Sequence, residues 1–204
     1  MRRLLIIGAG GHGAVVAESA LSSEQWREIA FLDDRFPSLN DVFGFPVIGV
    51  TAALIECLSD DSEFVVAIGD NDVRLRYQSA IESGGGRMAT VVDPSAVVSQ
   101  SSQIGHGSVI MATCVINARS VLGRGVIINT AATIDHDCVL ADGVHISPGA
   151  HLAGEVRVGE RAWIGLGATV NSGTHIGAAS IVGASAAVIN DIPAGATVVG
   201  VPAR

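Results

Sequence analysis

Large aromatic rings and charged side chains are both scarce in this 204-residue chain. Aromatic residues make up 4% and charged residues 16%, so the core must be built from stacked aliphatic side chains instead of rings. No apolar run approaches the roughly 18 residues that a membrane-spanning helix needs, so we expect no span. An excess of basic residues is also missing, because 12 Lys and Arg face 20 Asp and Glu. Phosphate binding along nucleic acid needs a basic surface, which excludes that class of partner.

Cysteine is scarce as well, with three residues and no CxxC pair. Cys114 and Cys138 occur at positions of the repeat described below that otherwise carry compact residues, which favours a buried structural role over a disulfide or a metal site. The glycine-rich stretch 4–13 lacks a small-residue cleavage site and makes a poor signal peptide. We therefore expect a cytoplasmic protein.

The dominant pattern is a period of six. Every sixth residue from Val98 to Val188 is Val, Ile or Leu without a break. This period matches neither an α-helix nor an alternating strand, and it is typical of a coil with three short faces. Gly, Asn or Asp often follows the aliphatic residue, as expected for tight corners. The pattern predicts a parallel β-helix of hexapeptide repeats from about Ser95 to Val188.

The first 93 residues follow a different pattern, in which short apolar strands alternate with helical stretches. We expect strands at 3–7, 29–32, 45–48, 64–68 and 88–92, and helices at 14–22, 51–58 and 73–83. Such alternation predicts a small parallel α/β sheet resembling half of a Rossmann fold. Asp93-Pro94 marks the boundary, which divides the chain into an α/β domain at 1–93 and a β-helix domain with a short tail at 94–204.

A glycine-rich loop joins the first expected strand to the first helix. Gly8, Gly10 and Gly13 have the GxGxxG spacing, and Asp33 follows 20 residues after the last of them. This spacing fits a nucleotide site, where backbone N–H groups approach a pyrophosphate and an acid binds a ribose. The motif alone also fits an ordinary tight turn. The second nucleotide-binding half is absent, so a single nucleotide diphosphate suits this sheet better than a dinucleotide cofactor.

Five of the six histidines lie in the repeat region, outside its core positions, so we expect their rings to face outward or into a subunit seam. Asp135 and Asp137 flank His136, and a neighbouring carboxylate equips an imidazole for general-base catalysis. His145 is half a coil away, so the two rings cannot share one face of a coil. The rival interpretation is an intersubunit zinc site using His145 and His151, whose spacing of six residues does not match the known pattern.

Several motifs together resemble the family of sialic-acid O-acetyltransferases and UDP-4-amino-sugar (bacillosamine) N-acetyltransferases, the NeuD/PglD type of hexapeptide-repeat acyltransferase. The resemblance covers essentially the whole chain. It rests on the hexapeptide run, GAGGHG (8–13), FLDD (31–34), AIGDN (67–71), NTAATIDHDC (129–138) and the terminal GVPAR.

The resemblance implies a homotrimer of left-handed β-helices with acetyl-CoA bound between neighbouring subunits, and no metal. It implies His136 as the general base and Asp137 as its carboxylate partner, where many relatives have Glu. The residues implied at acetyl-CoA are His145, Gly154, Leu166 and Ala184. Those implied at a nucleotide-linked amino sugar are Gly10, Gly11, His12, Asp33, Asp34 and Gly69.

The resulting hypothesis is N-acetylation of the 4-amino group of a UDP-linked amino sugar, for surface glycan synthesis. The alternatives are O-acetylation of sialic acid, N-acetylation of GDP-perosamine, and a trimer that binds nucleotide sugars without catalysis.

Overall fold

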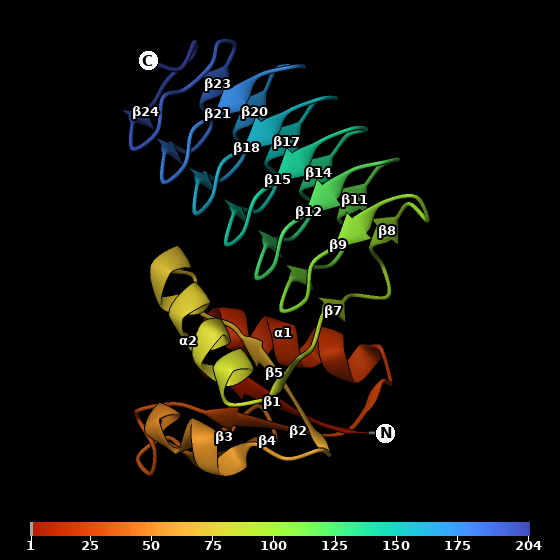
Figure 1. Ribbon diagram of the computed structural model, residues 1–204, viewed down its shortest axis with the longest axis vertical. Helices are drawn as coiled ribbons and strands as arrows, with labels where there is room; N and C mark the ends of the chain where they lie inside the picture. Colours follow the sequence, from red (N-terminus) through yellow and green to blue (C-terminus); the bar gives the residue numbers. More distant parts are fainter. Residues whose placement is uncertain (1) are drawn as a thin grey trace.

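The computed structural model describes residues 2–204 and consists of a small α/β sheet at the base of a three-sided parallel β-helix (Figure 1). The sheet has the strand order β3-β4-β2-β1-β5-β6. Its strands are β1 (Arg2–Ile7), β2 (Trp26–Leu32), β3 (Asp41–Val42), β4 (Phe45–Gly49), β5 (Ser62–Val66) and β6 (Arg87–Met88). The helices are α1 (Gly11–Ser22), the 3-10 helix η1 (Thr51–Cys57) and α2 (Asn71–Ser83). Within residues 2–204, no helix is both long and apolar enough to cross a membrane.

Three details of the α/β half differ from the sequence-based expectation. β3 runs antiparallel to β4, so the sheet is not entirely parallel. The two are joined by a tight hairpin at Phe43 and Gly44, which have φ of 51° and 89°. The helix expected from Ala14 begins at Gly11, and the helix expected at 51–58 is a 3-10 helix.

The glycine loop is tightly packed against the first strand. A Cβ atom at Gly13 would lie 2.1 Å from the Gly8 carbonyl oxygen, so only glycine fits there. Because Gly13 lets the chain pass close to the Gly8 carbonyl, helix α1 starts within the glycine motif, and His12 lies in the first turn of this helix.

The β-helix has three faces, which we call the first, second and third. The first face contains β7 (Val91–Val92), β10 (Val109–Ile110), β13 (Ile127–Ile128), β16 (His145–Ile146), β19 (Trp163–Ile164), β22 (Ile181–Val182) and β24 (Thr197–Val198). The second contains β8 (Val97–Val98), β11 (Val115–Ile116), β14 (Thr133–Ile134), β17 (His151–Leu152), β20 (Thr169–Val170) and β23 (Ala187–Val188). The third contains β9 (Gln103–Ile104), β12 (Val121–Leu122), β15 (Val139–Leu140), β18 (Arg157–Val158) and β21 (His175–Ile176).

Residues 18 positions apart lie above one another on each face, as in the pairing of Ile128 with Ile110 and Ile146. The second residue of each strand carries the aliphatic period and points inward, where Ile110, Ile128 and Ile146 are fully buried. The β-helix extends beyond the predicted 95–188. Val91 pairs with Val109, and Thr197 pairs with Ile181, so the expected strand at 88–92 is split between the two halves.

Two layers cover the α/β sheet. Helix α1 packs on the face that carries Leu4 and Ile6, and its apolar side joins the same buried cluster as the base of the β-helix. Helix α2 and η1 pack on the opposite face, against Leu5, Ile7 and Phe64. The first coils of the β-helix therefore share a core with the α/β half.

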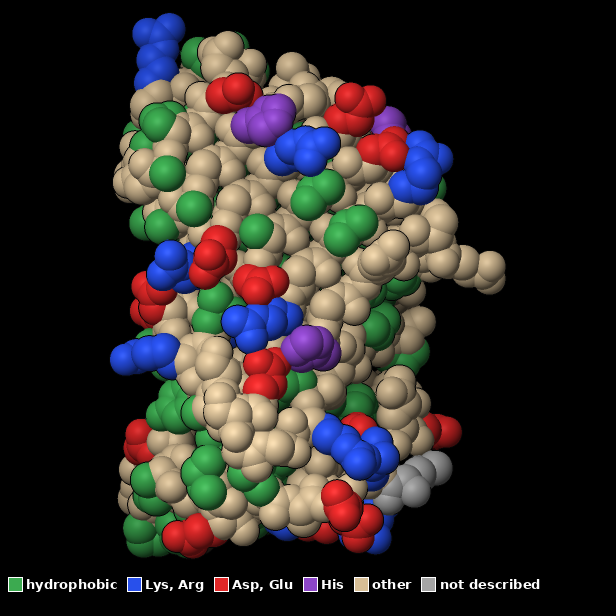
Figure 2. All heavy atoms as spheres, viewed as in Figure 1, with side chains coloured by type: hydrophobic (Ala, Val, Ile, Leu, Met, Phe, Trp, Pro, Cys, Tyr) green, Lys and Arg blue, Asp and Glu red, His purple; other side chains and the backbone are tan. Residues whose placement is uncertain are grey.

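Helix α2 also lies along the corner between the third and first faces of the β-helix. One turn of an α-helix rises about 5.4 Å and stacked strands are about 4.8 Å apart, so side chains one turn apart meet successive coils. Asn71 donates to the Arg161 carbonyl (2.8 Å), Arg74 to those of Gly143 (2.7 Å) and Gly125 (2.7 Å), and Gln78 to that of His106 (3.1 Å). Figure 2 shows acidic and basic side chains lying next to one another along this junction.

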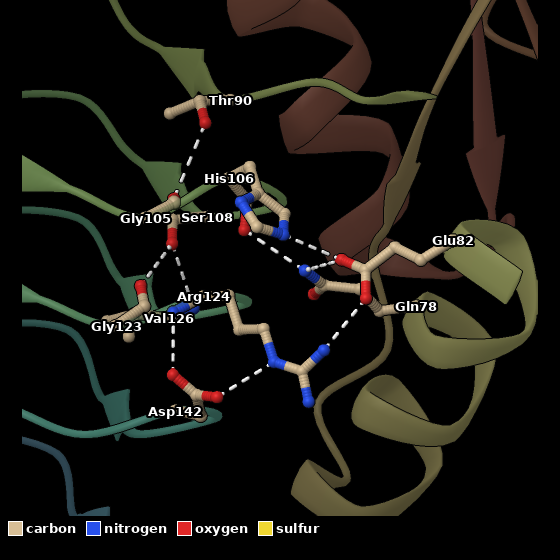
Figure 3. A network of polar contacts seen from close by, with 10 residues as sticks. All are labelled: Gln78, Glu82, Thr90, Gly105, His106, Ser108, Gly123, Arg124, Val126 and Asp142. Carbon is tan, nitrogen blue, oxygen red and sulfur yellow. Dashed lines mark hydrogen bonds and ion pairs between the residues drawn. The ribbon is translucent and has the colours of Figure 1, made fainter. Parts of the chain in front are cut away.

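At the C-terminal end of α2, Glu82 completes this junction (Figure 3). Its two carboxylate oxygens contact Nε2 of His106 at 2.7 Å and Nη1 of Arg124 at 2.7 Å. Nε of Arg124 in turn donates to Asp142 at 2.8 Å. These exposed and partly exposed pairs each contribute little, but together they define how the helix is aligned along the coils.

Arg74 is the most deeply buried charge of the junction, with 1% of its surface exposed. Its guanidinium donates to neutral oxygens only, four backbone carbonyls and one amide: Ile68 (2.9 Å), Gly69 (3.2 Å), Gly125 (2.7 Å), Gly143 (2.7 Å) and Asn71 Oδ1 (2.8 Å). Burial lowers its pKa to about 10, and the charge of Asp70 acts in the opposite direction. The side chain joins the edge of the α/β sheet to two coils.

We predict that Arg74→Met lowers the free energy of unfolding by about 3 kcal/mol, because it leaves buried carbonyls without donors. Urea denaturation measures the loss, and Arg76→Met, an exposed arginine on the same helix, is the matched control. Equal stability of the two variants would contradict a structural role for the buried guanidinium.

Candidate active site

His136 lies in the turn after β14, at the corner between the second and third faces. Its ring is half exposed, and Nδ1 is 2.8 Å from Oδ2 of Asp137. Asp137 has a left-handed backbone (φ 59°), and its short side chain still reaches the ring. A carboxylate can only accept a hydrogen bond, so Nδ1 carries the proton of the neutral ring and Nε2 keeps its lone pair. This arrangement prepares Nε2 to accept a proton.

Asp137 is held from the coil below by Arg119. Nε of Arg119 donates to Oδ1 at 2.7 Å, and Nη2 donates to Oδ2 at 2.7 Å. The hydrogen bonds from Arg119 and then from His136 lower the pKa of Asp137 to about 2. The carboxylate is therefore ionised throughout the neutral range and serves the ring as an acceptor.

Gly154 lies one coil above His136. A Cβ atom there would be 2.5 Å from Cε1 of the His136 ring, closer than real side chains come. The absence of a side chain at Gly154 thus provides the space in which the imidazole lies. The resemblance assigned Gly154 to acetyl-CoA, and in the structure its nearest neighbour is the imidazole.

His145 lies on the first face, where its ring was expected to face outward or into a subunit seam, and in the structure the ring is buried next to the α/β half. It is 8% exposed and stacks on Trp163 one coil above, with ring centroids 5.3 Å apart and planes 4° apart. Both of its ring nitrogens are buried and have no hydrogen-bond partner among residues 2–204, although the nearby Gly69 backbone slightly favours the charged form. The α/β half covers this strand, which the repeat pattern could not reveal.

Burial lowers the pKa of His145 to about 3, and the charges of Arg74 and His12 act in the same direction. His12 reaches this region from the first turn of α1, and its buried Nε2 has no hydrogen-bond partner within the described part of the chain, residues 2–204. Burial and then the charge of Arg74 lower the pKa of His12 to about 4. The two imidazoles are neutral at physiological pH, and each has a nitrogen free for a ligand.

A groove of about 410 Å³ runs beside His145 at the corner between the first and second faces. Leu166, Ala184 and Trp163 line it together with Asn129. Three of the four residues predicted at acetyl-CoA, His145, Leu166 and Ala184, therefore lie together. Gly154 lies with His136 at the next corner, and neither residue lines the groove beside His145.

The predicted nucleotide residues lie at the carboxyl ends of β1, β2 and β5. Cβ atoms at Gly10, Gly11 or Gly69 would meet no atom within 4 Å, so packing within the chain does not account for these glycines. They leave backbone open at the edge where α/β sheets bind ligands. Close approach of a ligand to this backbone would explain their small size.

The carboxylates of Asp33 and Asp34 are already bonded within the chain. Asp33 accepts from the Ala9 N–H at 2.7 Å and from Nε of Arg35 at 2.7 Å. These bonds, the one from Arg35 foremost, lower its pKa to about 2. Asp34 accepts from the backbone N–H and the hydroxyl of Thr51, at 2.9 and 2.6 Å. Both acids order the loops around the open glycines.

The structure also places the two histidines of the zinc hypothesis and the cysteine next to His136. His145 and His151 lie on different faces, and His151 contacts the Thr133 hydroxyl at 2.9 Å. Among residues 2–204, no group of three His, Cys, Asp or Glu side chains is arranged to hold a metal ion. Burial raises the pKa of the Cys138 thiol, whose Sγ donates to the Ala153 carbonyl. That thiol is a poor nucleophile despite its closeness in sequence to His136.

Comparisons with known proteins show the family of this chain. Residues 3–81 match the family model of the PglD N-terminal domain. The acetyltransferase domain of PglB from Neisseria gonorrhoeae FA1090, solved in complex with acetyl coenzyme A, is 48% identical with a TM-score of 0.97, covering 100% of this chain and 98% of that one. This chain belongs to the PglD-type family of hexapeptide-repeat acetyltransferases. The predicted fold, an α/β half followed by a left-handed β-helix, is thereby confirmed.

Two further members are similar to this chain. A histidine-to-asparagine variant of perosamine N-acetyltransferase from Caulobacter crescentus, solved with CoA and GDP-perosamine, is 41% identical with a TM-score of 0.91, covering 100% of this chain and 96% of that one. UDP-N-acetylbacillosamine N-acetyltransferase of Bacillus subtilis (strain 168) is 41% identical over 115 residues, or 55% of this chain. That match spans about half of the curated relative's length, 52%.

Some residues of the site escaped the sequence analysis. Arg119 is 18 positions before Asp137, and the period of the coil could have placed it beneath the carboxylate. Trp163 is likewise 18 positions after His145. No comparable signal marks Arg74, because its partners are backbone carbonyls brought to it by the packing of the two halves.

The depressed pKa of His145 predicts an acid-sensitive fold. An unfolded histidine binds a proton near pH 6.5, whereas folded His145 does so only near 3, so stability is lost as the pH falls through this window. His145→Gln should reduce the slope of unfolding free energy against pH by up to about 1.4 kcal/mol per pH unit between about pH 6 and 4. Urea titrations at several pH values measure it, with the exposed His175→Gln as control. An unchanged slope would show that His145 is solvated.

Proposed function

We propose that this protein transfers the acetyl group of acetyl-CoA to the 4-amino group of a UDP-linked amino sugar, for surface glycan synthesis. The observation that carries the proposal is the His136–Asp137 pair, which presents a free Nε2 in a chain that also has an apolar groove and an open glycine edge. The names of the relatives support it, since they include a UDP-sugar N-acetyltransferase and a domain solved with acetyl-CoA.

The proposed chemistry needs no covalent acyl-enzyme, because the thioester is already activated. The neutral sugar amine attacks the thioester carbonyl carbon, the new C–N bond forms, and the C–S bond breaks to release the CoA thiolate. The attacking nitrogen becomes an ammonium and passes its proton to Nε2 of His136, which can then protonate the thiolate. A positioned base of this kind contributes about 10²- to 10⁴-fold in rate.

We assign the two ligands to different halves of the chain. Residues 1–93 form the nucleotide-sugar domain, with Gly10, Gly11, His12, Asp33, Asp34 and Gly69 at its ligand edge. Residues 94–204 form the acetyltransferase domain, with acetyl-CoA along His145, Leu166 and Ala184. In this arrangement Asp33 and Asp34 hold the loops, and the backbone at the glycines approaches the diphosphate.

The active site in this proposal lies between subunits of a homotrimer. His136 is at one corner of the β-helix and the groove beside His145 is at another, so one chain does not bring base and acetyl donor together. A neighbouring copy related by a threefold axis can place its His136 beside this groove. We locate the enzyme in the cytoplasm, a reducing compartment that suits its three free cysteines.

A specific observation favours a second substrate, GDP-perosamine. The relative solved with that sugar nucleotide is 41% identical and matches this chain over its full length. The chemistry at His136 is the same for both. A thiol-release assay with acetyl-CoA against UDP- and GDP-linked 4-amino sugars and free sialic acid distinguishes the two substrates from O-acetylation.

We predict that His136→Ala lowers kcat by about 10²- to 10⁴-fold, because the ammonium loses its proton acceptor. Acetyl-CoA binding, measured by calorimetry, should be unchanged, and the exposed His175→Ala should keep full activity. Full turnover by His136→Ala would show that another group serves as the base, whereas no turnover by the wild type on any acceptor would leave the protein as a nucleotide-sugar-binding trimer.

Subunit mixing tests the shared site. His136→Ala lacks the base, and Leu166→Arg obstructs the groove, so each homotrimer should be inactive. Co-expressed in equal amounts, the two variants should recover about a quarter of wild-type activity, because random assembly pairs an intact base with an intact groove at one site in four. If trimers verified to contain both variants recover no activity, the base and the groove of each site belong to the same subunit.

A further inference from the structure

The corner that carries His136 also carries a vertical row of charges. Arg119, Asp137 and Glu155 are 18 positions apart and occupy equivalent places in three successive coils. All three have left-handed backbones, with φ of 60°, 59° and 64°. Because the backbone has the same conformation in each coil, the three side chains leave the corner in the same direction and lie one above another.

Three acids lie in this row and next to it, and the carboxylate of Asp137 contacts the imidazole. Asp135 accepts from the His136 backbone N–H at 2.8 Å and from Nδ2 of Asn117 at 3.0 Å. Asp137 contacts the ring, and the backbone N–H of Glu155 donates to the His136 carbonyl at 2.9 Å. Arg119 supplies the positive charge next to these acids, through its ion pair with Asp137.

The Arg119 side chain is oriented by the carboxylate. It is 66% exposed, so packing does little to hold it. Its guanidinium Nε and Nη2 donate to the two carboxylate oxygens of Asp137, each at 2.7 Å. Its backbone N–H is fixed from below by Oγ of Ser101 at 3.1 Å. Arginine matches a carboxylate with two parallel bonds, a geometry that the point charge of lysine does not reproduce.

We propose that Arg119 is a positioning residue that holds the Asp137 carboxylate in the plane where Oδ2 accepts from Nδ1 of His136. This inference rests on the proposed function and adds a residue to it. Oδ2 accepts from both Arg119 and His136, so rotation of the carboxylate would break either bond. Arg119 therefore keeps the proton on Nδ1 and the lone pair on Nε2, where the substrate amine needs it.

Arg119 also sets the charge around the ring. Without it, the Asp137 carboxylate contacts the imidazole uncompensated and favours the protonated form of the ring. A protonated ring cannot accept the ammonium proton. Loss of Arg119 should therefore move the acid limb of the activity profile to higher pH, since a higher pH is needed to free the base.

The test compares Arg119→Met and Arg119→Lys with the wild type. Arg119→Met should lower kcat roughly 10-fold, the typical effect of losing a residue that orients a catalytic side chain. The KM values for both substrates should stay within about twofold of the wild-type values. The acid limb of this variant should shift to higher pH, because the Asp137 carboxylate next to the ring loses its neutralising partner. Arg119→Lys should return the acid limb of the activity profile to its wild-type pH, because the positive charge is restored. It should recover little of kcat, because lysine cannot make the two parallel bonds of the guanidinium. Arg157→Met, an exposed arginine of the third face, is the control.

A second measurement does not depend on turnover. ¹⁵N NMR of the imidazole at pH 8 should show the Nδ1–H tautomer of His136 in the wild type and a mixture of tautomers in Arg119→Met. This separates the two hypotheses, because a wild type inactive on every acceptor would refute the proposed function and leave the tautomer result to decide the role of Arg119.

Three outcomes would overturn the inference. One is a kcat and pH profile of Arg119→Met equal to those of the wild type. Another is a raised KM for acetyl-CoA at unchanged kcat, which would make Arg119 a ligand contact. The third is an unchanged tautomer in the variant.

Discussion

The hydrogen-bonded stacking of one coil on the next is the constraint on which the whole molecule depends. Each strand pairs in parallel with the strand 18 residues later, so any residue has a fixed neighbour about 4.8 Å above and below it. That spacing places Arg119 beneath Asp137, Gly154 over His136 and Trp163 over His145. The site is thus built from short-range vertical contacts between coils, even though its residues are distant in sequence.

The same spacing explains how the α/β half is attached. One turn of α2 nearly matches one coil, so Asn71, Arg74 and Gln78 each find a carbonyl on a successive turn of the β-helix. The buried charge of Arg74 is costly unless all its donors are paired, which makes the alignment specific. Because Arg74 also binds the Ile68 and Gly69 carbonyls, the glycine edge and the strand of His145 are held in one rigid relation. The covering of His145 by this half is what keeps the imidazole neutral.

Sequence reasoning succeeded where the physics is local or periodic. The sixfold aliphatic period predicted the β-helix because each inward position must fill the same narrow core. Asp137 next to His136 was predicted as its partner, and the distance of 2.8 Å agrees with that pairing. It failed for His145, since the pattern of a repeat describes a coil in isolation and not the domain that packs over it. It also placed the start of the β-helix at Ser95, beyond the expected boundary at Asp93-Pro94, although Val92 continues the hexapeptide phase six positions before Val98 and pairs with Ile110 of β10.

By itself the sequence determined the coil, its corners, the glycine edge and the histidine–aspartate pair, because each depends on neighbours along the chain or on a constant period. Only the tertiary structure decided which histidine is buried, which acids are already bonded, and which arginine supports the base. The burial of His145 and the bonds of the acids depend on contacts between elements whose spacing in sequence shows no repeat. The hydrogen bonds of Arg119 depend on the orientation of a side chain, which the period of the coil does not specify. The buried Arg74 is the clearest case, since backbone carbonyls are present at every residue and only folding selects which of them it meets.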